Sequence, residues 1–291
     1  LLVRLPGGAR AGERVATPVC VTDVLPTFLD ALALPPAADI DGRSLLASEP
    51  ARGTYFESYT GYLNYGWSPI TGWVDARGKY LHGTTDEFYD VERDPGELRN
   101  LAGERGTEVE RMRASLSALA ALPRIERAAT EGLDDTLRAD IEALGYAGAA
   151  SGASASPEPL AETGWPDARE RMDELERFYR AVLRHNKGKV AEALAELTAL
   201  TEENPRNTTA LNVLATYLYS AKRTAEALAT LERIPAAARE RVTVQDLLGH
   251  CLEDLGRAAE ALAHFERALA LKPGDAHQEQ DVARAKRVAP R

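Results

Sequence analysis

Acidic side chains are concentrated in one short stretch, residues 86–102, which reads DEFYDVERDPGELRNLA. Its six carboxylates are those of Asp86, Glu87, Asp90, Glu92, Asp94 and Glu97. Carboxylates that converge can transfer protons or hold a hard metal ion. Here the apolar residues predict a strand, and the sequence DPG predicts a turn after it. The acidic groups are therefore expected to be spread along the chain in a solvated, structural role.

Histidine and cysteine, the other residue types that often do chemistry, are scarce in the first half of the chain. His82 is the only histidine before residue 150, and it lies at the end of an expected strand. Cys20 is flanked by valines and has no basic residue beside it, which favours a buried apolar role. Cys251 is too far from Cys20 in sequence to outline a disulfide framework or a metal site. We therefore predict no catalytic residue and no metal ligand in this chain.

Aromatic residues gather between Tyr55 and Tyr80, a segment that holds half of the ten tyrosines and two of the three tryptophans. The part reading SYTGYLNYGWSP is too irregular for a strand and too aromatic for an ordinary loop. One interpretation is a pocket mouth, with a substrate entrance bordered by Tyr59, Tyr62, Tyr65 and Trp67. The alternative is that the rings close a small sheet.

Charge and hydropathy restrict the classes of partner. The 291 residues carry a net charge of -10, which argues against nucleic acid and anionic membrane as partners. No apolar run is long enough to predict a membrane span. The chain starts with LLVRLPGG, which has the pattern of a strand and no initiator methionine, so we expect it to be a piece of a longer protein. Its compartment is undetermined from the sequence.

The elements that must position these residues divide into two kinds. Residues 1–148 show short strands, such as GTYFESY and ITGWV, and helical periodicity over 22–34 and 107–122, which predicts an α/β domain. The first of these helices is expected to turn one apolar face to the core, made of Val24, Leu25, Phe28, Leu29 and Leu32. Residues 149–165 are rich in small residues and proline and predict a flexible linker, and residues 166–291 are helical throughout.

The helical part repeats itself with a period of 34 residues. Three windows are predicted, at 174–207, 208–241 and 242–275, followed by an end helix. The third window has the clearest pattern, with Leu248, Gly249, Leu252, Gly256, Ala261, Phe265, Ala268 and Pro273. Small residues at these places allow two helices to cross closely, and large apolar residues fill the space between them. The pattern resembles the tetratricopeptide repeat, which implies an all-α solenoid.

Such a solenoid has a concave face that is lined by the first helix of each pair. The side chains expected on it are Asn212, Thr216, Tyr219, Asp246, His250, Glu253 and Asp254. We interpret this face as a groove for a protein or peptide, with basic groups of the partner meeting the acidic third repeat. The alternative is a solvated face, or a surface that packs on the other domain.

Four segments of the first half, in order, resemble the carboxyl-terminal part of the sulfatases, members of the alkaline phosphatase superfamily. They read LLVRLPGG, VATPVCVTDVLPTFLDALALPPAADIDGRSLL, YGWSPITGWVDARGKYL and EFYDVERDPGELRNLA. The resemblance covers about residues 1–102, continues weakly into IEALGYAG, and implies the end of an α/β fold with a small antiparallel sheet. A sulfatase domain followed by such repeats is an arrangement of bacterial proteins.

The family uses a formylglycine, made from the cysteine of a Cys-x-Pro-x-Arg motif, beside a calcium ion. Neither Cys20 nor Cys251 is followed by this motif. The resemblance thus implies that the nucleophile and the calcium ligands belong to a part of the parent protein that precedes Leu1, and that this chain alone is inactive. It is compatible with a periplasmic or other extracytoplasmic parent.

Three functions follow as hypotheses. The first is a fragment of a sulfatase-like sulfuric ester hydrolase that carries a protein-binding repeat module. The second is a non-catalytic tetratricopeptide scaffold in which the repeats do all the work. The third is a phosphotransferase of the same superfamily.

Overall fold

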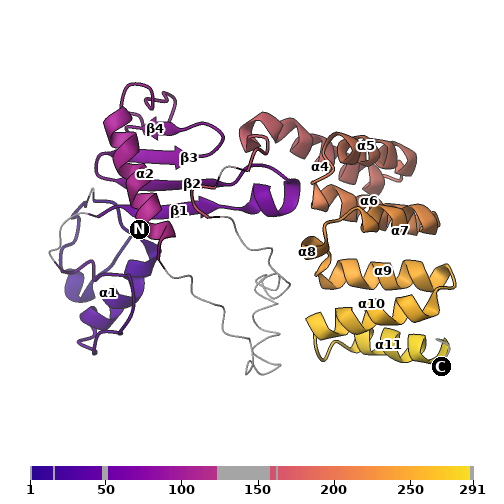
Figure 1. Cartoon of the computed structure of the whole chain (residues 1–291). Helices are drawn as coiled ribbons and strands as arrows, with labels where there is room; N and C mark the ends of the chain where they lie inside the picture. Colours follow the sequence, from indigo (N-terminus) through magenta and orange to yellow (C-terminus); the bar gives the residue numbers. More distant parts are fainter. Residues whose placement is uncertain (1, 16, 48–51, 123–157, 162, 289–291) are drawn as a thin grey trace. The chain divides into compact units, whose positions relative to one another are not determined.

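The computed structural model describes residues 2–15, 17–47, 52–122, 158–161 and 163–288 (Figure 1). The chain forms two compact units. Of the described residues, the first contains 2–15, 17–47, 52–58, 70–122 and 158–161, and the second contains 59–69 and 163–288. Most of the predicted linker, and the segment IEALGYAG, lie outside the described residues.

The first unit is built on a four-stranded sheet in which each strand pairs antiparallel with the next along the chain (Figure 1). The strands are β1 (Thr54–Ser58), β2 (Ile70–Asp75), β3 (Gly78–His82) and β4 (Glu87–Tyr89). Trp73 lies opposite Tyr55 on one side and Tyr80 on the other, so three aromatic rings follow each other across the sheet. The small antiparallel sheet expected for this part of the chain is confirmed.

Helix α2 (Gly106–Ala120) covers the sheet and supplies most of the core of the first unit. Val109, Met112 and Leu116 are spaced by three and four residues, which places them on one face of the helix. They pack against Tyr80 and Phe88 of the sheet, and all five side chains are buried. Full burial of side chains of this size stabilises a fold by about 1.5–3 kcal/mol each.

Helix α1 (Val24–Ala31) differs from the expectation, because its apolar residues do not form a core. Leu25, Phe28 and Leu32 are 53%, 62% and 65% exposed. The buried residues are polar: the Asp23 carboxylate accepts hydrogen bonds from two backbone amides, and Thr27 donates to the Asp23 carbonyl. The prediction of an apolar core face was therefore wrong for the described residues, since Leu25, Phe28 and Leu32 are exposed and Val24 and Leu29 are only half-buried.

Short helical turns complete the description outside the repeats. They are the 3₁₀ turns η1 (Pro6–Gly8), η2 (Val21–Asp23) and η4 (Ala168–Arg171), and the π-helical turn η3 (Gly61–Tyr65). Of these, η3 and η4 belong to the second unit.

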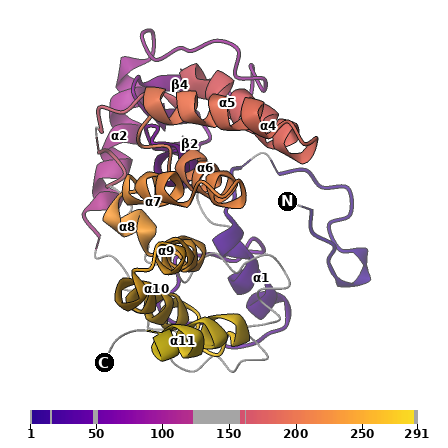
Figure 2. The ribbon, with the colours of Figure 1, turned by 90° about the vertical axis from the view of Figure 1, so that its right-hand side faces the viewer.

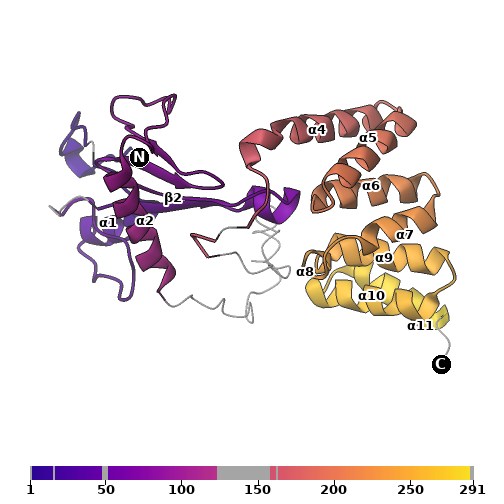
Figure 3. The same ribbon diagram turned by 45° about the horizontal axis from the view of Figure 1, so that its top comes forward.

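The rest of the second unit is a stack of paired helices in chain order, as three views agree (Figures 1, 2 and 3). Its helices are α4 (Met172–Asn186), α5 (Val190–Glu203), α6 (Thr208–Ser220), α7 (Thr224–Glu232), α8 (Ala236–Arg239), α9 (Val242–Asp254), α10 (Ala258–Leu271) and α11 (Ala276–Val288). The expected all-α solenoid after the sheet is confirmed. None of the described helices combines the length and the apolar composition that a membrane crossing requires.

Small residues at a spacing of 34 allow the paired helices to approach closely. Ala181, Ala215 and Gly249 occupy equivalent places in α4, α6 and α9, and all three are buried. The large residues at the equivalent places of the second helices are Leu197, Leu231 and Phe265, each with no exposed surface. In the third pair a Cβ atom on residue 249 would lie 2.5 Å from the Phe265 ring. The third pair therefore combines a larger residue on its second helix, Phe265 in place of Leu, with a smaller one on its first helix, Gly249 in place of Ala.

The turn inside each pair has the same backbone conformation. Gly188, Lys222 and Gly256, again 34 residues apart, have φ angles of 77°, 63° and 76°. This left-handed conformation is easy for glycine and costly for a residue with a Cβ atom. The three turns are equivalent in geometry although the middle one has lost its glycine.

The packing of Gly249 on Phe265 predicts a specific rescue. Gly249→Ala is expected to lower the free energy of unfolding of the repeats by about 1–3 kcal/mol, because the added methyl group overpacks the crossing. Adding Phe265→Leu reproduces the Ala and Leu combination of the first two pairs and should recover much of this loss. Denaturant titration followed by helical circular dichroism measures both effects. A double variant less stable than either single variant would contradict the packing argument.

Candidate binding face of the helical repeats

Four helices of the second unit share one face, which we call the first-helix face: α4, α6, α9 and α11. The ring of His185 on α4 stacks on Tyr217 of α6, with centroids 3.5 Å apart. The ring centroid of Tyr219 on α6 lies 6.4 Å from that of His250 on α9, and the centroid of His250 lies 6.2 Å from that of His277 on α11. Side chains from consecutive first helices thus meet, and α11 continues the row beyond the last full pair.

The predicted groove residues on α6 offer hydrogen-bonding groups of different availability. The hydroxyl of Thr216 is exposed but already donates to the backbone carbonyl of Asn212, at 2.9 Å. The side-chain oxygen of Asn212 is buried and accepts no hydrogen bond within the described part of the chain. This acceptor of Asn212 is therefore unused but closed to solvent.

Tyr219 and Asp254, both predicted for the groove, lie together. Burial raises the pKa of Tyr219, and a hydrogen bond to Asp254 raises it further, to about 12. The phenol therefore stays protonated at neutral pH and keeps its donor. Asp254 itself is exposed to solvent.

The predicted residues of α9 form charged contacts with α11. Glu253 receives the guanidinium of Arg284 through bonds of 2.8–3.2 Å. Asp246 accepts a hydrogen bond of 3.1 Å from the amide of Gln278. These bonds attach the end helix to the last repeat.

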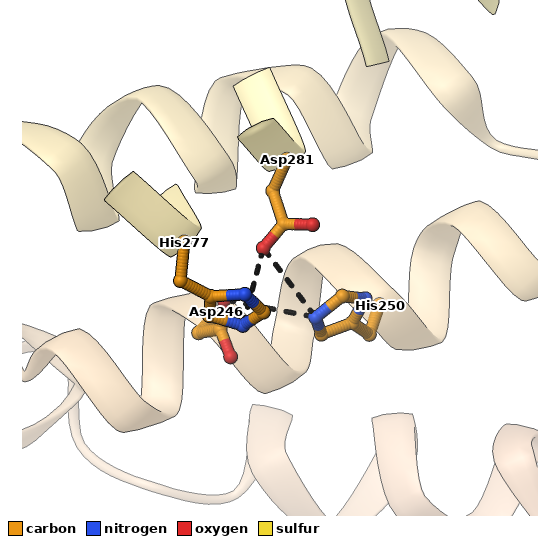
Figure 4. Close-up of side chains that lie close together, drawn as sticks. All are labelled: Asp246, His250, His277 and Asp281. Atoms are coloured by element: carbon orange, nitrogen blue, oxygen red, sulfur yellow. Dashed lines mark ion pairs between the residues drawn. The ribbon is translucent and has the colours of Figure 1, made fainter. Parts of the chain in front are cut away.

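A cluster of two imidazoles and two carboxylates lies between α9 and α11: Asp246, His250, His277 and Asp281 (Figure 4). Nε2 of His250 is 3.7 Å from Asp246 Oδ1 and 3.7 Å from Asp281 Oδ2, and Nε2 of His277 is 3.4 Å from Asp281 Oδ2. One ligand atom from each of the four residues lies within 4.8 Å of the others. It is the one such group of three or more metal-ligating side chains that the described residues contain.

Asp281 is the buried member of this cluster. The residue has no exposed surface, and its Oδ1 atom forms an ion pair of 2.5 Å with Arg284. Its Oδ2 atom faces both histidines and has no hydrogen-bond partner among the residues described. His277, in contrast, is 64% exposed and lies at the solvent side.

Two members of this cluster, Asp246 and His250, are among the predicted groove residues, whereas His277 and Asp281 are not. A signal was present, because D246-x-x-x-H250 and H277-x-x-x-D281 both have the spacing of four that brings side chains together on one helix face. The missing information was that α11 lies beside α9.

The four aromatic residues predicted for a substrate entrance belong to the second unit, not to the sheet. Tyr62 stacks on Trp165 with centroids 4.5 Å apart, and Tyr65 stacks on Trp67 at 4.7 Å. Tyr59 is half-buried and meets Tyr62 edge to face. The segment packs on the repeat helices, a contact that neither interpretation of the sequence anticipated. Its role at a substrate entrance stays a prediction.

The carboxylate of Glu174, at the start of α4, anchors this aromatic segment. It accepts hydrogen bonds from the Trp67 indole, at 3.3 Å, and from the Asn204 amide, at 2.9 Å. The same Asn204 amide nitrogen donates to the backbone carbonyl of Tyr65, at 2.8 Å. Glu174 is buried and also pairs with Arg171, so its charge is compensated from several sides.

The carboxylates of residues 86–97 do not converge in the described structure. Asp86 accepts from Tyr80 and Arg113; burial raises its pKa, but these hydrogen bonds outweigh burial and hold the pKa below its usual value. Glu97 binds Lys79 at 2.7 Å. Separate partners of this kind agree with a structural role for the stretch.

Comparison with known proteins identifies the helical region. Family models described as tetratricopeptide repeat match residues 186–251 and 242–275. These residues are therefore tetratricopeptide repeats, a class of protein-interaction module built from stacked helix pairs.

One curated relative and two solved structures place the chain among known proteins. The chain is 32% identical over 107 residues to an uncharacterized sulfatase, YidJ of Escherichia coli K12, and the match covers 35% of this chain and 21% of that protein. This chain thus spans about a fifth of that relative's length. The tetratricopeptide domain of OM64 from Arabidopsis matches with 18% identity and a TM-score of 0.38, over 40% of this chain and 96% of that one. The first such domain of human RPAP3 matches with 20% identity and a TM-score of 0.36, over 40% and 91%.

Removal of the Glu174 carboxylate tests the anchoring of the aromatic segment. Glu174→Ala is expected to destabilise the second unit by about 1–3 kcal/mol, because it leaves the Trp67 and Asn204 donors buried without an acceptor. Tryptophan fluorescence should shift to longer wavelength as Trp67 becomes hydrated. Glu176→Ala, an exposed position on the same helix, is the matched control. Equal stability and equal emission of the two variants would contradict the anchoring role.

Proposed function

We propose that this protein binds an extended or helical peptide that carries lysine or arginine, through the first-helix face. The observation that carries the proposal is the acidity of a face that belongs to tetratricopeptide repeats. Its third repeat presents Asp246, Glu253 and Asp254, while Arg284 of the end helix is already paired with Glu253 and with the buried Asp281. A surplus of negative charge on one face favours a cationic partner and accelerates its association.

The α6 part of the same face supplies groups for a peptide backbone. The exposed hydroxyl of Thr216 and the phenol of Tyr219 each donate their hydrogen within the chain, to the Asn212 carbonyl and to Asp254, and their oxygen lone pairs suit a peptide N–H group. Hydrogen bonds to the main chain provide affinity for any sequence, whereas charged side chains select among sequences. The proposed division is backbone contacts on α6 and selection for basic side chains on α9.

A positional-scanning peptide library, with binding measured by fluorescence anisotropy, tests this function. The full chain should select lysine and arginine. Asp254→Lys should weaken the selected peptides about fivefold to tenfold, the effect of about 1 kcal/mol from one charge contact. Glu232→Lys, an exposed position on the second-helix side, is the matched control and should leave binding unchanged. Absence of selection for basic residues, or equal losses in both variants, would refute the proposed partner.

For the first unit, we propose an origin in the carboxyl-terminal part of a sulfatase-like hydrolase. The 32% identity to the YidJ sulfatase supports this. The exposed apolar side chains of α1, Leu25 and Phe28, also support it, since an apolar helix face of this size ordinarily packs against a further layer. In this proposal the formylglycine and the calcium ion belong to the rest of the parent protein. The repeats bring the parent protein to a partner.

The proposal predicts that the 291-residue chain alone does not hydrolyse sulfate esters. An aryl sulfate assay, with an aryl phosphate in parallel, should show no turnover above buffer in either case. Turnover of the sulfate that a chelator abolishes would show that the chain holds a complete site. Turnover of the phosphate ester would instead favour the phosphotransferase alternative.

A further inference from the structure

We propose that Asp246, His250, His277 and Asp281 bind one divalent transition-metal ion of the zinc class, and that this ion fixes the end helix α11 to α9. Neither the proposed peptide function nor the resemblance to sulfatases requires such a site.

The separations fit a four-coordinate ion. Zinc binds imidazole nitrogen and carboxylate oxygen at about 2.0–2.2 Å, so neighbouring ligands of a tetrahedral site lie about 3.3–3.6 Å apart. Three nitrogen–oxygen pairs in the cluster are separated by 3.4, 3.7 and 3.7 Å, and all four ligand atoms lie within 4.8 Å of one another. Small side-chain rotations would therefore complete the coordination.

Asp281 provides the second, independent observation. A carboxylate without exposed surface is costly unless its oxygens are paired, and ion pairs or metal ions are the usual solutions. Oδ1 forms an ion pair with Arg284, but neither carboxylate oxygen has a hydrogen-bond partner within the described chain, and Oδ2 faces His250 and His277 (Figure 4). A cation between the two imidazoles would satisfy this oxygen.

The donor set selects the class of ion. Two imidazole nitrogens and two carboxylate oxygens suit zinc and its neighbours in the first transition row, whereas calcium and magnesium prefer sites made of oxygen alone. The two carboxylates also balance the charge of a divalent ion.

Neighbouring residues hold the ligands in place, as outer-sphere residues of metal sites do. Arg284 bridges Asp281 and Glu253, and Gln278 donates to Asp246. Helices α9 and α11 each contribute one histidine and one aspartate, so a bound ion would cross-link the two helices. Exposure of His277 leaves a route for the ion from solvent.

Titration of the full chain with Zn²⁺, after treatment with a chelator and without a histidine tag, tests the site. Calorimetry should give one ion per chain, and Co²⁺ should show the intense visible absorption of tetrahedral coordination. His277→Ala should weaken Zn²⁺ by at least about 10–100-fold, the loss known for outer-sphere partners alone. Because His277 is exposed, this variant should fold normally, and circular dichroism checks that it does. Zn²⁺ should also slow amide hydrogen exchange in α11 of the unaltered chain.

His185→Ala is the matched control, since this histidine lies on the same face but outside the cluster. It should retain the affinity of the unaltered chain for Zn²⁺. The proposal is overturned if the chain does not bind Zn²⁺ at one equivalent, if both alanine variants bind equally, or if calcium competes as well as zinc. The first two outcomes would mean that the four side chains form an ion-pair network that holds no zinc, and the third that the cluster does not select an ion of the zinc class. Peptide selection measured with chelator present separates this result from the proposed function.

Discussion

The close crossing of paired helices at Ala181, Ala215 and Gly249 is the contact on which the rest of the helical unit depends. All three positions are buried, and at Gly249 even a Cβ atom would lie 2.5 Å from the Phe265 ring of the second helix. Each crossing fixes how one pair is oriented, and its repetition every 34 residues fixes how pairs follow each other. The shared face of α4, α6 and α9 results from this repetition and needs no additional specification.

The two ends of the stack are finished by buried carboxylates. At the start, Glu174 accepts hydrogen bonds from Trp67 of the aromatic segment and from Asn204, the residue that follows α5. At the end, Asp281 connects α11 to α9. Buried charges demand partners with good geometry, so they determine which segment packs there more strictly than apolar contacts do. Terminal elements of repeat stacks lack one neighbour, and here polar anchors replace the missing apolar interface.

The sequence predicted those features that depend on regular spacing. The repeats were predictable because a 34-residue period reports contacts between neighbouring helices, which lie close together in the chain. The sheet was predictable from its alternating strands and turns. The apolar pattern of α1, in contrast, predicts a helix and an apolar face but not what covers this face, and Phe28 remains exposed.

Contacts between distant segments were the part that sequence reasoning missed. Trp67 and Glu174 are 107 residues apart, and no local pattern announces their hydrogen bond. His277 and Asp281 were missed for a related reason, because each spacing of four gives only half of the cluster. The other half depends on which helices lie side by side. The face of the first helices could thus be predicted from the sequence, whereas the four-residue cluster on it could be found only in the structure.

Lys222 gives the stack an uneven distribution of local stability. It holds the left-handed turn conformation that glycine provides in the first and third pairs, at a cost of about 1–2 kcal/mol for a residue with a Cβ atom. A linear array transmits stability only between neighbours, so a weak central unit limits how far order propagates from either end. We therefore expect local unfolding to begin at the middle pair. Once this pair has unfolded, the first and third pairs would no longer stabilise each other.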